Sequence, residues 1–251
     1  MRTRRLSVLL ASALVASLAW VGIAPAPAGA AAKDPVIIVA GTFSPAFANE
    51  PLAARLRANG YQVHIFELPT LGTQDIRLTA QALDSFADGV RAQHGAARVD
   101  LIGHSQGGLV ARAYVKWYGG AGEVDSLITL GAPHRGTYLA NLANLAGFGN
   151  CLTIVACQQM LIGSSFLNDL NAGDDTIGNV RYTTIRTSGD LIVRPVDNAT
   201  LHDGAVNVRI QDKCWLRAVG HLTLITDGTV YSGIRQALEG KTNINLNCWA
   251  L

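Results

Sequence analysis

The segment from Val99 to Tyr118 constrains the fold of this chain more than any other part of the sequence. The apolar run Val99-Asp100-Leu101-Ile102 is typical of a buried strand, and the stretch Gln106–Tyr118 is typical of an amphipathic helix. Between them stands Gly103-His104-Ser105-Gln106-Gly107, a G-x-S-x-G motif. The motif alone is weak evidence, but a strand entering it and a helix leaving it predict a sharp turn that lifts the Ser105 hydroxyl clear of the backbone.

An ordinary strand–turn–helix joint with an incidental serine is the alternative interpretation of this segment. Gly103, Gly107 and Gly108 favour the sharp turn, because a Cβ at these positions would collide with the neighbouring strand or helix. The N-terminus of the following helix would direct free N–H groups and a positive dipole end toward the serine. The segment therefore predicts a nucleophilic serine beside a site for an oxyanion.

Short runs rich in Val and Ile alternate with longer amphipathic stretches along the rest of the chain. Strands are expected at Val36–Ala40, Gln62–Phe66, Val99–Ile102, Ser126–Leu130, Tyr182–Thr187 and Ala205–Ile210. Helices are expected at Pro51–Asn59, Asp75–Gln93, Gln106–Tyr118 and Thr229–Glu239. This alternation predicts an α/β fold with a mostly parallel central sheet and helices on both faces.

One segment, about residues 137–173, interrupts the alternation with apolar pieces punctuated by Gly and Asn. We interpret it as a lid-like or cap-like insertion over the strand ends. Its apolar residues, at spacings compatible with short helices, fit either core packing or the wall of a cleft. They are Leu139, Leu142, Leu145, Ile154, Val155, Met160, Leu161 and Phe166.

The N-terminus has the layout of a secretory signal peptide. Three arginines precede an apolar run from Leu6 to Ile23, and small residues follow Pro25 and Pro27. We therefore expect residues 1–30 to be removed, with cleavage near residues 30–32, and residues 31–251 to form one secreted domain. An uncleaved membrane anchor is the alternative, because the apolar run is close to the length that spans a bilayer.

The charge of the expected mature chain excludes some partners. Residues 1–30 hold three of the 20 Lys and Arg and none of the 18 Asp and Glu, so their removal leaves a formal charge of −1. No basic block remains, and aromatic residues make up only 6% of the chain. We therefore expect no nucleic-acid partner, and no membrane span in the mature protein.

Cys151, Cys157, Cys214 and Cys248 are even in number and all lie in the expected mature chain. Disulfides are expected in an oxidising compartment, and the pairs Cys151–Cys157 and Cys214–Cys248 would each close a local loop. A zinc site is the alternative. Close Cys-x-x-Cys pairs and a histidine at ligand spacing are both lacking, so we expect no metal.

A serine nucleophile needs a base, and after a strand–elbow–helix turn the partners follow in the order Ser, acid, His. His134 precedes any acid candidate, and His202 lies in a turn that leads into the last strand. His221 lies beyond the last strand, where a loop can reach over the strand ends to Ser105. We therefore take His221 as the base.

The acid should stand just past the end of a strand, where it can accept a hydrogen bond from the base. Asp190 follows the strand Tyr182–Thr187 through the turn Ser188-Gly189 and fits best, with Asp197 second. The backbone N–H of Gln106 and one from the loop after the first strand would bind an oxyanion. We choose Thr42 for the second donor, whose hydroxyl could add a third.

Five segments of the chain resemble the small secreted lipases of the α/β-hydrolase superfamily. They are similar to bacterial class 2 lipases and, at the oxyanion loop, to the yeast lipase B type. The segments are Val36-Ile37-Ile38-Val39-Ala40-Gly41-Thr42, Val99 through Ala111, Thr129-Leu130-Gly131-Ala132-Pro133-His134-Arg135-Gly136, Ser188-Gly189-Asp190-Leu191-Ile192-Val193 and Val219-Gly220-His221. Ala40-Gly41 departs from the His-Gly that the bacterial relatives carry at this loop.

The resemblance implies Ser105 as nucleophile, Asp190 as acid, His221 as base, and Thr42 and Gln106 as oxyanion donors. It implies hydrolysis of carboxylic esters, in particular acylglycerols at a lipid–water interface, by a monomer that needs no cofactor. A polyester depolymerase or an acyltransferase would use the same residues. A non-catalytic binding protein with this fold is the alternative from another class.

Overall fold

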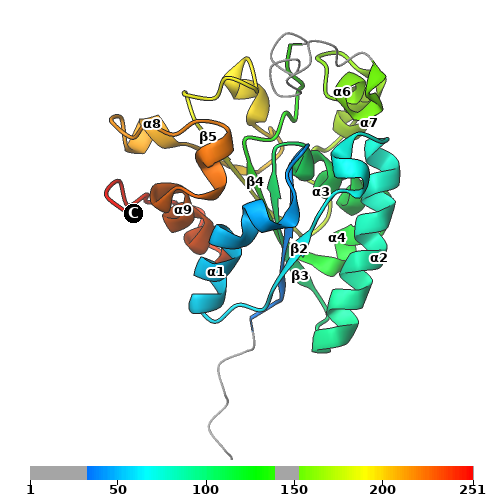
Figure 1. Ribbon diagram of the computed structural model, residues 1–251, viewed down its shortest axis with the longest axis horizontal. Helices are drawn as coiled ribbons and strands as arrows, with labels where there is room; N and C mark the ends of the chain where they lie inside the picture. The colour runs from blue at the N-terminus through cyan, green and yellow to red at the C-terminus, as the bar shows by residue number, and fades with distance from the viewer. Residues whose placement is uncertain (1–32, 139–152, 251) are drawn as a thin grey trace, which may run out of the picture. The chain divides into compact units, whose positions relative to one another are not determined.

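The computed structural model describes residues 33–138 and 153–250, which form a six-stranded parallel sheet flanked by helices (Figure 1). The strand order is β2-β1-β3-β4-β5-β6. The strands are β1 Val36–Val39, β2 Val63–Phe66, β3 Val99–His104, β4 Val124–Leu130, β5 Arg181–Arg186 and β6 Val206–Arg209. Each expected strand is therefore present, within a few residues of its expected ends, and the α/β class is confirmed.

Helices cover both faces of the sheet because the strands are apolar on both sides. Val36 and Ile38 of β1 pack on one face with α1 (Glu50–Ala58) and α9 (Gly228–Leu238). Ile37 and Val39 pack on the other face with α2 (Ile76–His94) and α3 (Gln106–Trp117). The alternation follows from the two-residue period of a strand. Shorter helices are α4 (Gly120–Glu123) and α8 (Ile210–Lys213).

Four 3-10 turns complete the described part: η1 Ala46–Asn49, η2 Pro69–Gly72, η4 Val196–Ala199 and η5 Leu222–Ile225. No helix within residues 33–138 and 153–250 is long and apolar enough to cross a membrane. The expected signal peptide lies outside the described residues.

The described part of the insertion forms two short helices, α6 (Val155–Gln159) and α7 (Ser165–Asn171). Met160, Phe166 and Leu170 are buried in the same core as α2 and α3. Phe166 stacks edge-on against Trp117, with ring centroids 5.9 Å apart. These apolar residues therefore serve core packing, the first of the two expected alternatives. Leu139, Leu142 and Leu145 lie outside the described residues.

A disulfide joins Cys214 to Cys248, with the two Cα atoms 5.3 Å apart. It ties the segment after α8 to the C-terminal tail. Cys151 lies outside the described residues, so the expected pair Cys151–Cys157 is not described. Cys157 itself is buried in α6.

The buried carboxyl of Asp100 makes stability depend on pH. Burial, together with Asp125 and Asp34, raises the pKa of Asp100 to about 8. The unfolded chain releases this proton near pH 3.8, so the folded state binds more protons between pH 3.8 and about 8. The contribution of Asp100 to stability is therefore complete below pH 3.8 and is lost as the pH rises through this window.

We expect Asp100→Asn to remove this dependence, because an amide does not ionise. Urea unfolding gives the free energy of unfolding of wild type and of the variant at pH 5 and at pH 8. The difference, variant minus wild type, should be larger at pH 8 than at pH 5 by more than about 1 kcal/mol, in favour of the variant. The exposed Asp197→Asn is the control and should show no such change. An equal effect of Asp100→Asn at both pH values would contradict the assignment.

Candidate active site

Ser105 stands on a sharp turn between β3 and α3. Its backbone has φ 53° and ψ −126°, a conformation that is costly for a residue with a side chain. A Cβ on Gly103 would come within 2.6 Å of Gly108, and one on Gly107 would overlap the carbonyls of Val39 and Ala40. The glycines of the motif are therefore required by the close approach of α3 to β1 and β3.

The structure brings Ser105, His221 and Asp190 together from three distant parts of the chain. The Oγ of Ser105 lies 2.9 Å from Nε2 of His221, and Nδ1 of His221 lies 2.7 Å from Oδ2 of Asp190. All three side chains are at least 95% buried. With a proton on Nδ1 of His221, the imidazole donates to the carboxylate and accepts from the serine hydroxyl.

Backbone groups hold Asp190 in place. The N–H groups of Ile192 and Val193 each donate to Oδ1 of Asp190 at 2.8 Å, which leaves Oδ2 for His221. Gly131, with φ 58°, lies directly beneath, and a Cβ there would stand 3.1 Å from Oδ2 and 3.2 Å from Nδ1 of His221. Gly131 was not among the predicted site residues, although its place directly after a strand was visible in the sequence.

His104 is a second residue that the sequence analysis missed. Its Nε2 lies 3.0 Å from the carbonyl oxygen of His221, which can only accept, so His104 is the donor. Burial, followed by the nearby His221, lowers the pKa of His104 to about 3, so its ring is neutral. The ring centroids of His104 and His221 are 5.0 Å apart. His104 thus anchors the loop that carries His221.

The predicted oxyanion donors flank Ser105. Neither the N–H of Thr42 nor that of Gln106 has a hydrogen-bond acceptor among the described residues. The hydroxyl of Thr42 donates to Oε1 of Gln106 at 2.6 Å. The expectation that this hydroxyl is a further donor to the oxyanion is therefore not met in this arrangement, because the neighbouring amide already accepts its proton. The adjoining Phe43 has φ 56°, and its N–H donates to the carbonyl of Leu71 at 2.9 Å.

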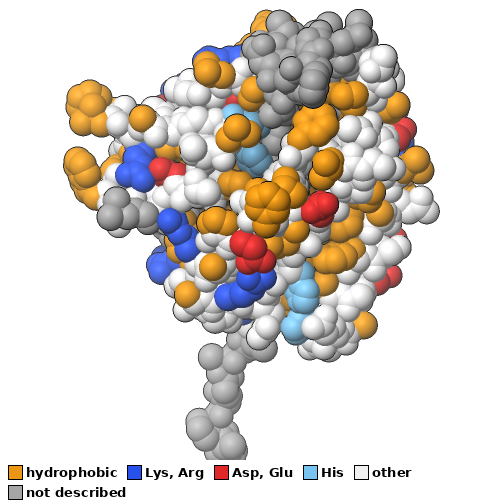
Figure 2. All heavy atoms as spheres, in the orientation of Figure 1, with side chains coloured by type: hydrophobic (Ala, Val, Ile, Leu, Met, Phe, Trp, Pro, Cys, Tyr) orange, Lys and Arg blue, Asp and Glu red, His pale blue; other side chains and the backbone are white. Residues whose placement is uncertain are grey.

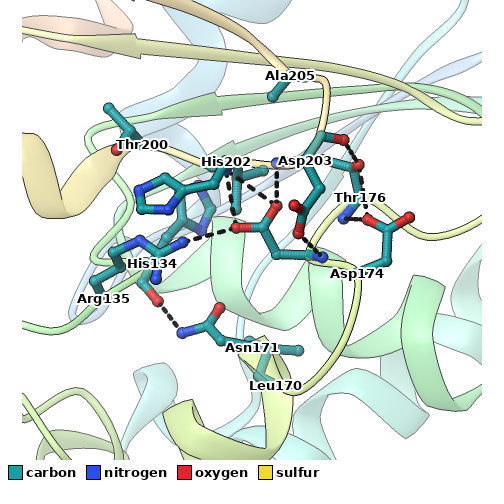
Figure 3. A network of polar contacts seen from close by, with 12 residues as sticks. His134, Arg135, Leu170, Asn171, Asp174, Thr176, Thr200, His202, Asp203 and Ala205 are labelled. Carbon is teal, nitrogen blue, oxygen red and sulfur yellow. Dashed lines mark hydrogen bonds and ion pairs between the residues drawn. The ribbon is translucent and has the colours of Figure 1, made fainter.

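The alternative bases lie elsewhere. His134 is fully buried, and its Nε2 is 2.9 Å from Oγ1 of Thr129. Figure 3 shows His134 and His202 beside a polar network that includes Asp174 and Asp203. Asp175 accepts from the backbone N–H groups of His202 and Asp203. The alternative acid Asp197 is exposed and pairs with Arg186 at 3.0 Å.

The acidic groups of this network have partners already. The carboxylate oxygens of Asp174, Asp175 and Asp203 lie within 4.8 Å of one another. Burial alone would raise the pKa of Asp175, but backbone hydrogen bonds from Asp203 and His202, together with the nearby Arg112 and Arg135, lower that pKa below its usual value. Arg135 pairs with Asp175 at 3.0 Å. The network therefore joins the loop after β4 to the segments before and after β5.

A cleft of about 350 Å³ opens on Ser105 and His221. Its walls come from the segments 42–48 and 221–225, and they include the apolar side chains Phe43, Ala48, Leu222 and Ile225. A second hollow of about 320 Å³ lies on the other side of Leu222, beside Leu191 and Ile192. No described residue of the insertion lines either space. A cleft wall was the second alternative for the insertion, and in the described part of the chain that apolar wall is supplied instead by the loops after β1 and β6.

A parallel sheet with a serine on a strained turn after its central strand defines an α/β-hydrolase fold. The family model for palmitoyl protein thioesterase matches residues 35–184, more than half of the chain. The chain belongs to this lipase-like family of α/β-hydrolases. The match covers β1, the Ser105 turn and β4, and ends before Asp190 and His221.

Two curated relatives are triacylglycerol lipases. The one from Pseudarthrobacter phenanthrenivorans is 30% identical over 171 residues, 63% of this chain and 53% of the relative. The one from Burkholderia plantarii is 30% identical over 203 residues, 74% of this chain and 56% of the relative. The chain therefore spans about half the length of these relatives.

Solved lipase structures share the fold. Aspergillus fumigatus lipase B matches with a TM-score of 0.70 and 21% identity, over 82% of this chain and 52% of the other. The mature Bacillus licheniformis lipase BlEst2 matches with a TM-score of 0.67 and 20% identity, over 83% and 93% of the two chains.

Proposed function

We propose that this protein is a secreted lipase or carboxylesterase that cleaves carboxylic esters through Ser105, His221 and Asp190. The observation that carries the proposal is the pair of hydrogen bonds from Ser105 to His221 and from His221 to Asp190, at 2.9 and 2.7 Å. The curated triacylglycerol lipases support the substrate class. The open cleft beside Ser105 gives an ester access to the hydroxyl.

Each group has one task in the reaction. Oγ of Ser105 attacks the ester carbonyl while Nε2 of His221 takes its proton, and Asp190 stabilises the resulting imidazolium. The carbonyl oxygen becomes an oxyanion, to which the N–H groups of Thr42 and Gln106 donate. The imidazolium then protonates the departing alcohol and leaves an acyl group on Ser105. A water molecule, deprotonated by His221, releases the carboxylic acid and restores the serine.

Secretion and processing are part of the proposal. The arginines and apolar run of residues 1–30 support an export signal, and the disulfide Cys214–Cys248 fits an oxidising compartment. We also assign the chain to the class 2 type of bacterial lipase, with a lipase B type oxyanion loop at Gly41-Thr42. Residues 31–251 would then form the single mature domain.

Labelling with a fluorophosphonate tests the proposal directly. The reagent should form a covalent adduct on Ser105, located by peptide mass spectrometry, because only an activated serine attacks phosphorus at an appreciable rate. Ser165, which begins α7, is the internal comparison and should stay unlabelled. Absence of an adduct on Ser105 in folded protein would favour a non-catalytic binding protein.

The length of the acyl chain is the next expectation. The apolar residues Phe43, Leu222 and Ile225 line the cleft, and each buried CH₂ contributes up to about 0.8 kcal/mol. We expect kcat/KM for p-nitrophenyl esters to rise from acetate to medium chains, and emulsified triacylglycerols to be hydrolysed. A preference for acetate with no action on emulsions would indicate a short-chain esterase.

A thioesterase is a second candidate, because the family description names palmitoyl protein thioesterase. The same groups could attack a thioester carbonyl. Palmitoyl-CoA and a p-nitrophenyl ester assayed side by side decide between the two, since faster release of CoA at matched concentrations would favour the thioesterase. Adding an alcohol to either assay detects acyl transfer as ester product.

The contact from His104 to the His221 carbonyl predicts a kinetic effect. We expect His104→Phe to lower kcat about 10-fold with little change in KM, because the ring volume stays while the donor to the base loop is lost. His104→Gln, which can still donate, should retain more activity. Equal kcat for His104→Phe and wild type would contradict a role in positioning His221.

A further inference from the structure

Three large apolar side chains stand exposed around the Cys214–Cys248 disulfide. Trp215, Leu216 and Trp249 are 78%, 68% and 84% exposed. They lie beside a hollow of about 310 Å³ between the segments 213–217 and 248–249. Figure 2 shows apolar side chains projecting at the edge of the molecule that Figure 1 labels with α8 and the C-terminus. We call these three side chains the tryptophan platform.

The backbone beneath the platform is fixed. The disulfide joins the residue before Trp215 to the residue before Trp249. Arg217 donates to the carbonyls on both sides of Trp249, those of Cys248 at 3.4 Å and Ala250 at 2.8 Å. The same guanidinium pairs with Asp227 at 2.8 Å. Two indoles are therefore held out in water by a covalent bond and by partly buried polar contacts, which costs free energy unless a partner covers them.

Among the described residues, one unpaired cation stands beside the platform. Arg217 is balanced by Asp227, and Arg209 pairs with Asp212 at 2.6 Å. Lys213 has no ion-pair partner among residues 33–138 and 153–250, and no carboxylate lines the hollow. The platform thus combines amphipathic indoles with an unpaired cation.

The platform is attached to the catalytic edge of the sheet. Helix α8 begins directly after β6, at the carboxyl end of that strand, and Ser105 lies at the same end of β3. From Arg217 the chain continues through Val219, whose carbonyl accepts from Thr187 at 2.8 Å, to His221. Leu191 and Leu222, beside the second hollow, are also 69% and 64% exposed.

We propose that the tryptophan platform docks this protein on an anionic lipid–water surface. Indole rings favour the boundary between hydrocarbon and water, where one side is apolar and the N–H is wet. Lys213 would add electrostatic attraction to negatively charged headgroups. Single projecting side chains suit a deformable lipid layer better than a shaped protein partner.

The docking rests on the proposed function in one respect, because ester hydrolysis would supply negative charge to the lipid surface. Each turnover on a lipid releases a carboxylate, which makes the surface more negative as the reaction proceeds. The platform would therefore hold the protein more firmly on a surface that it is already digesting.

Vesicle sedimentation tests the docking with the mature Ser105→Ala protein, so that the lipids stay intact. Vesicles of phosphatidylcholine alone and of phosphatidylcholine mixed with phosphatidylglycerol are compared. We expect stronger binding to the mixed vesicles, and about 10-fold weaker binding for each of Trp215→Ala and Trp249→Ala. Lys213→Gln should reduce the difference between the two vesicle types. Leu78→Ala, at a 58% exposed position on α2, is the control and should bind normally.

Hydrolysis of a soluble p-nitrophenyl ester by the same substitutions in the active protein separates this inference from the proposed function. Trp215→Ala and Trp249→Ala should keep wild-type rates there. An inactive wild type that still binds mixed vesicles through the two tryptophans would sink the proposed function and leave the docking standing. Equal vesicle binding with and without the tryptophans overturns the docking. Self-association of the wild-type protein that these two substitutions abolish would also overturn the docking, because the platform would then be an interface between protein molecules.

Discussion

Ser105→Ala should leave a folded protein whose esterase activity falls at least about 1,000-fold. Among the described residues the hydroxyl makes one hydrogen bond, to His221, and it lines the cleft, so its removal costs little packing. Rates on a p-nitrophenyl ester measure the loss, and the melting temperature checks the fold. The strained φ of 53° is unchanged by the substitution, so the turn should persist. Turnover above a few per cent of wild type would remove Ser105 from the mechanism.

The second large effect separates the base and acid from their alternatives. His221→Ala and Asp190→Asn should each lower kcat by at least about 100-fold, because one removes the proton acceptor and the other the charge that orients it. The matched controls are His202→Ala and Asp197→Asn. Both controls are exposed, and in the described part of the chain the hydroxyl of Ser105 bonds to His221 and to neither of them, so they should retain nearly full rates. The reverse ranking would move the proposed triad to other residues.

The fold was largely predictable because its elements carry strong local patterns. β1, β3 and β4 contain short runs rich in Val, Ile and Leu, whereas β5 and β6 mix apolar residues with Arg, Thr or Asn. Helices α1, α2, α3 and α9 have amphipathic periods and glycine or cap signals at their ends. The insertion was harder to interpret. Its apolar spacing fits core packing and a cleft wall equally well, and only the position of α7 against α3 shows that Phe166 and Leu170 belong to the core.

The candidate site, too, was predictable from the sequence only in part. The chain order of Ser105, Asp190 and His221 follows from strand ends, because parallel strands place their following loops at one edge of the sheet. The contribution of His104 could not be derived in this way. Its partner is a backbone carbonyl 117 positions away, and a carbonyl has no sequence signature.

The sequence by itself determined the class of fold, the strained serine turn and the order of the groups around it, since each depends on local pattern and glycine content. The tertiary structure alone decided which distant residues contact one another and which side chains stay exposed. It directs the Thr42 hydroxyl to Gln106, places Gly131 beneath Asp190, and leaves Trp215 and Trp249 in water. The physical reason is that burial and hydrogen-bond partners depend on contacts between distant segments, which periodicity along the chain does not encode.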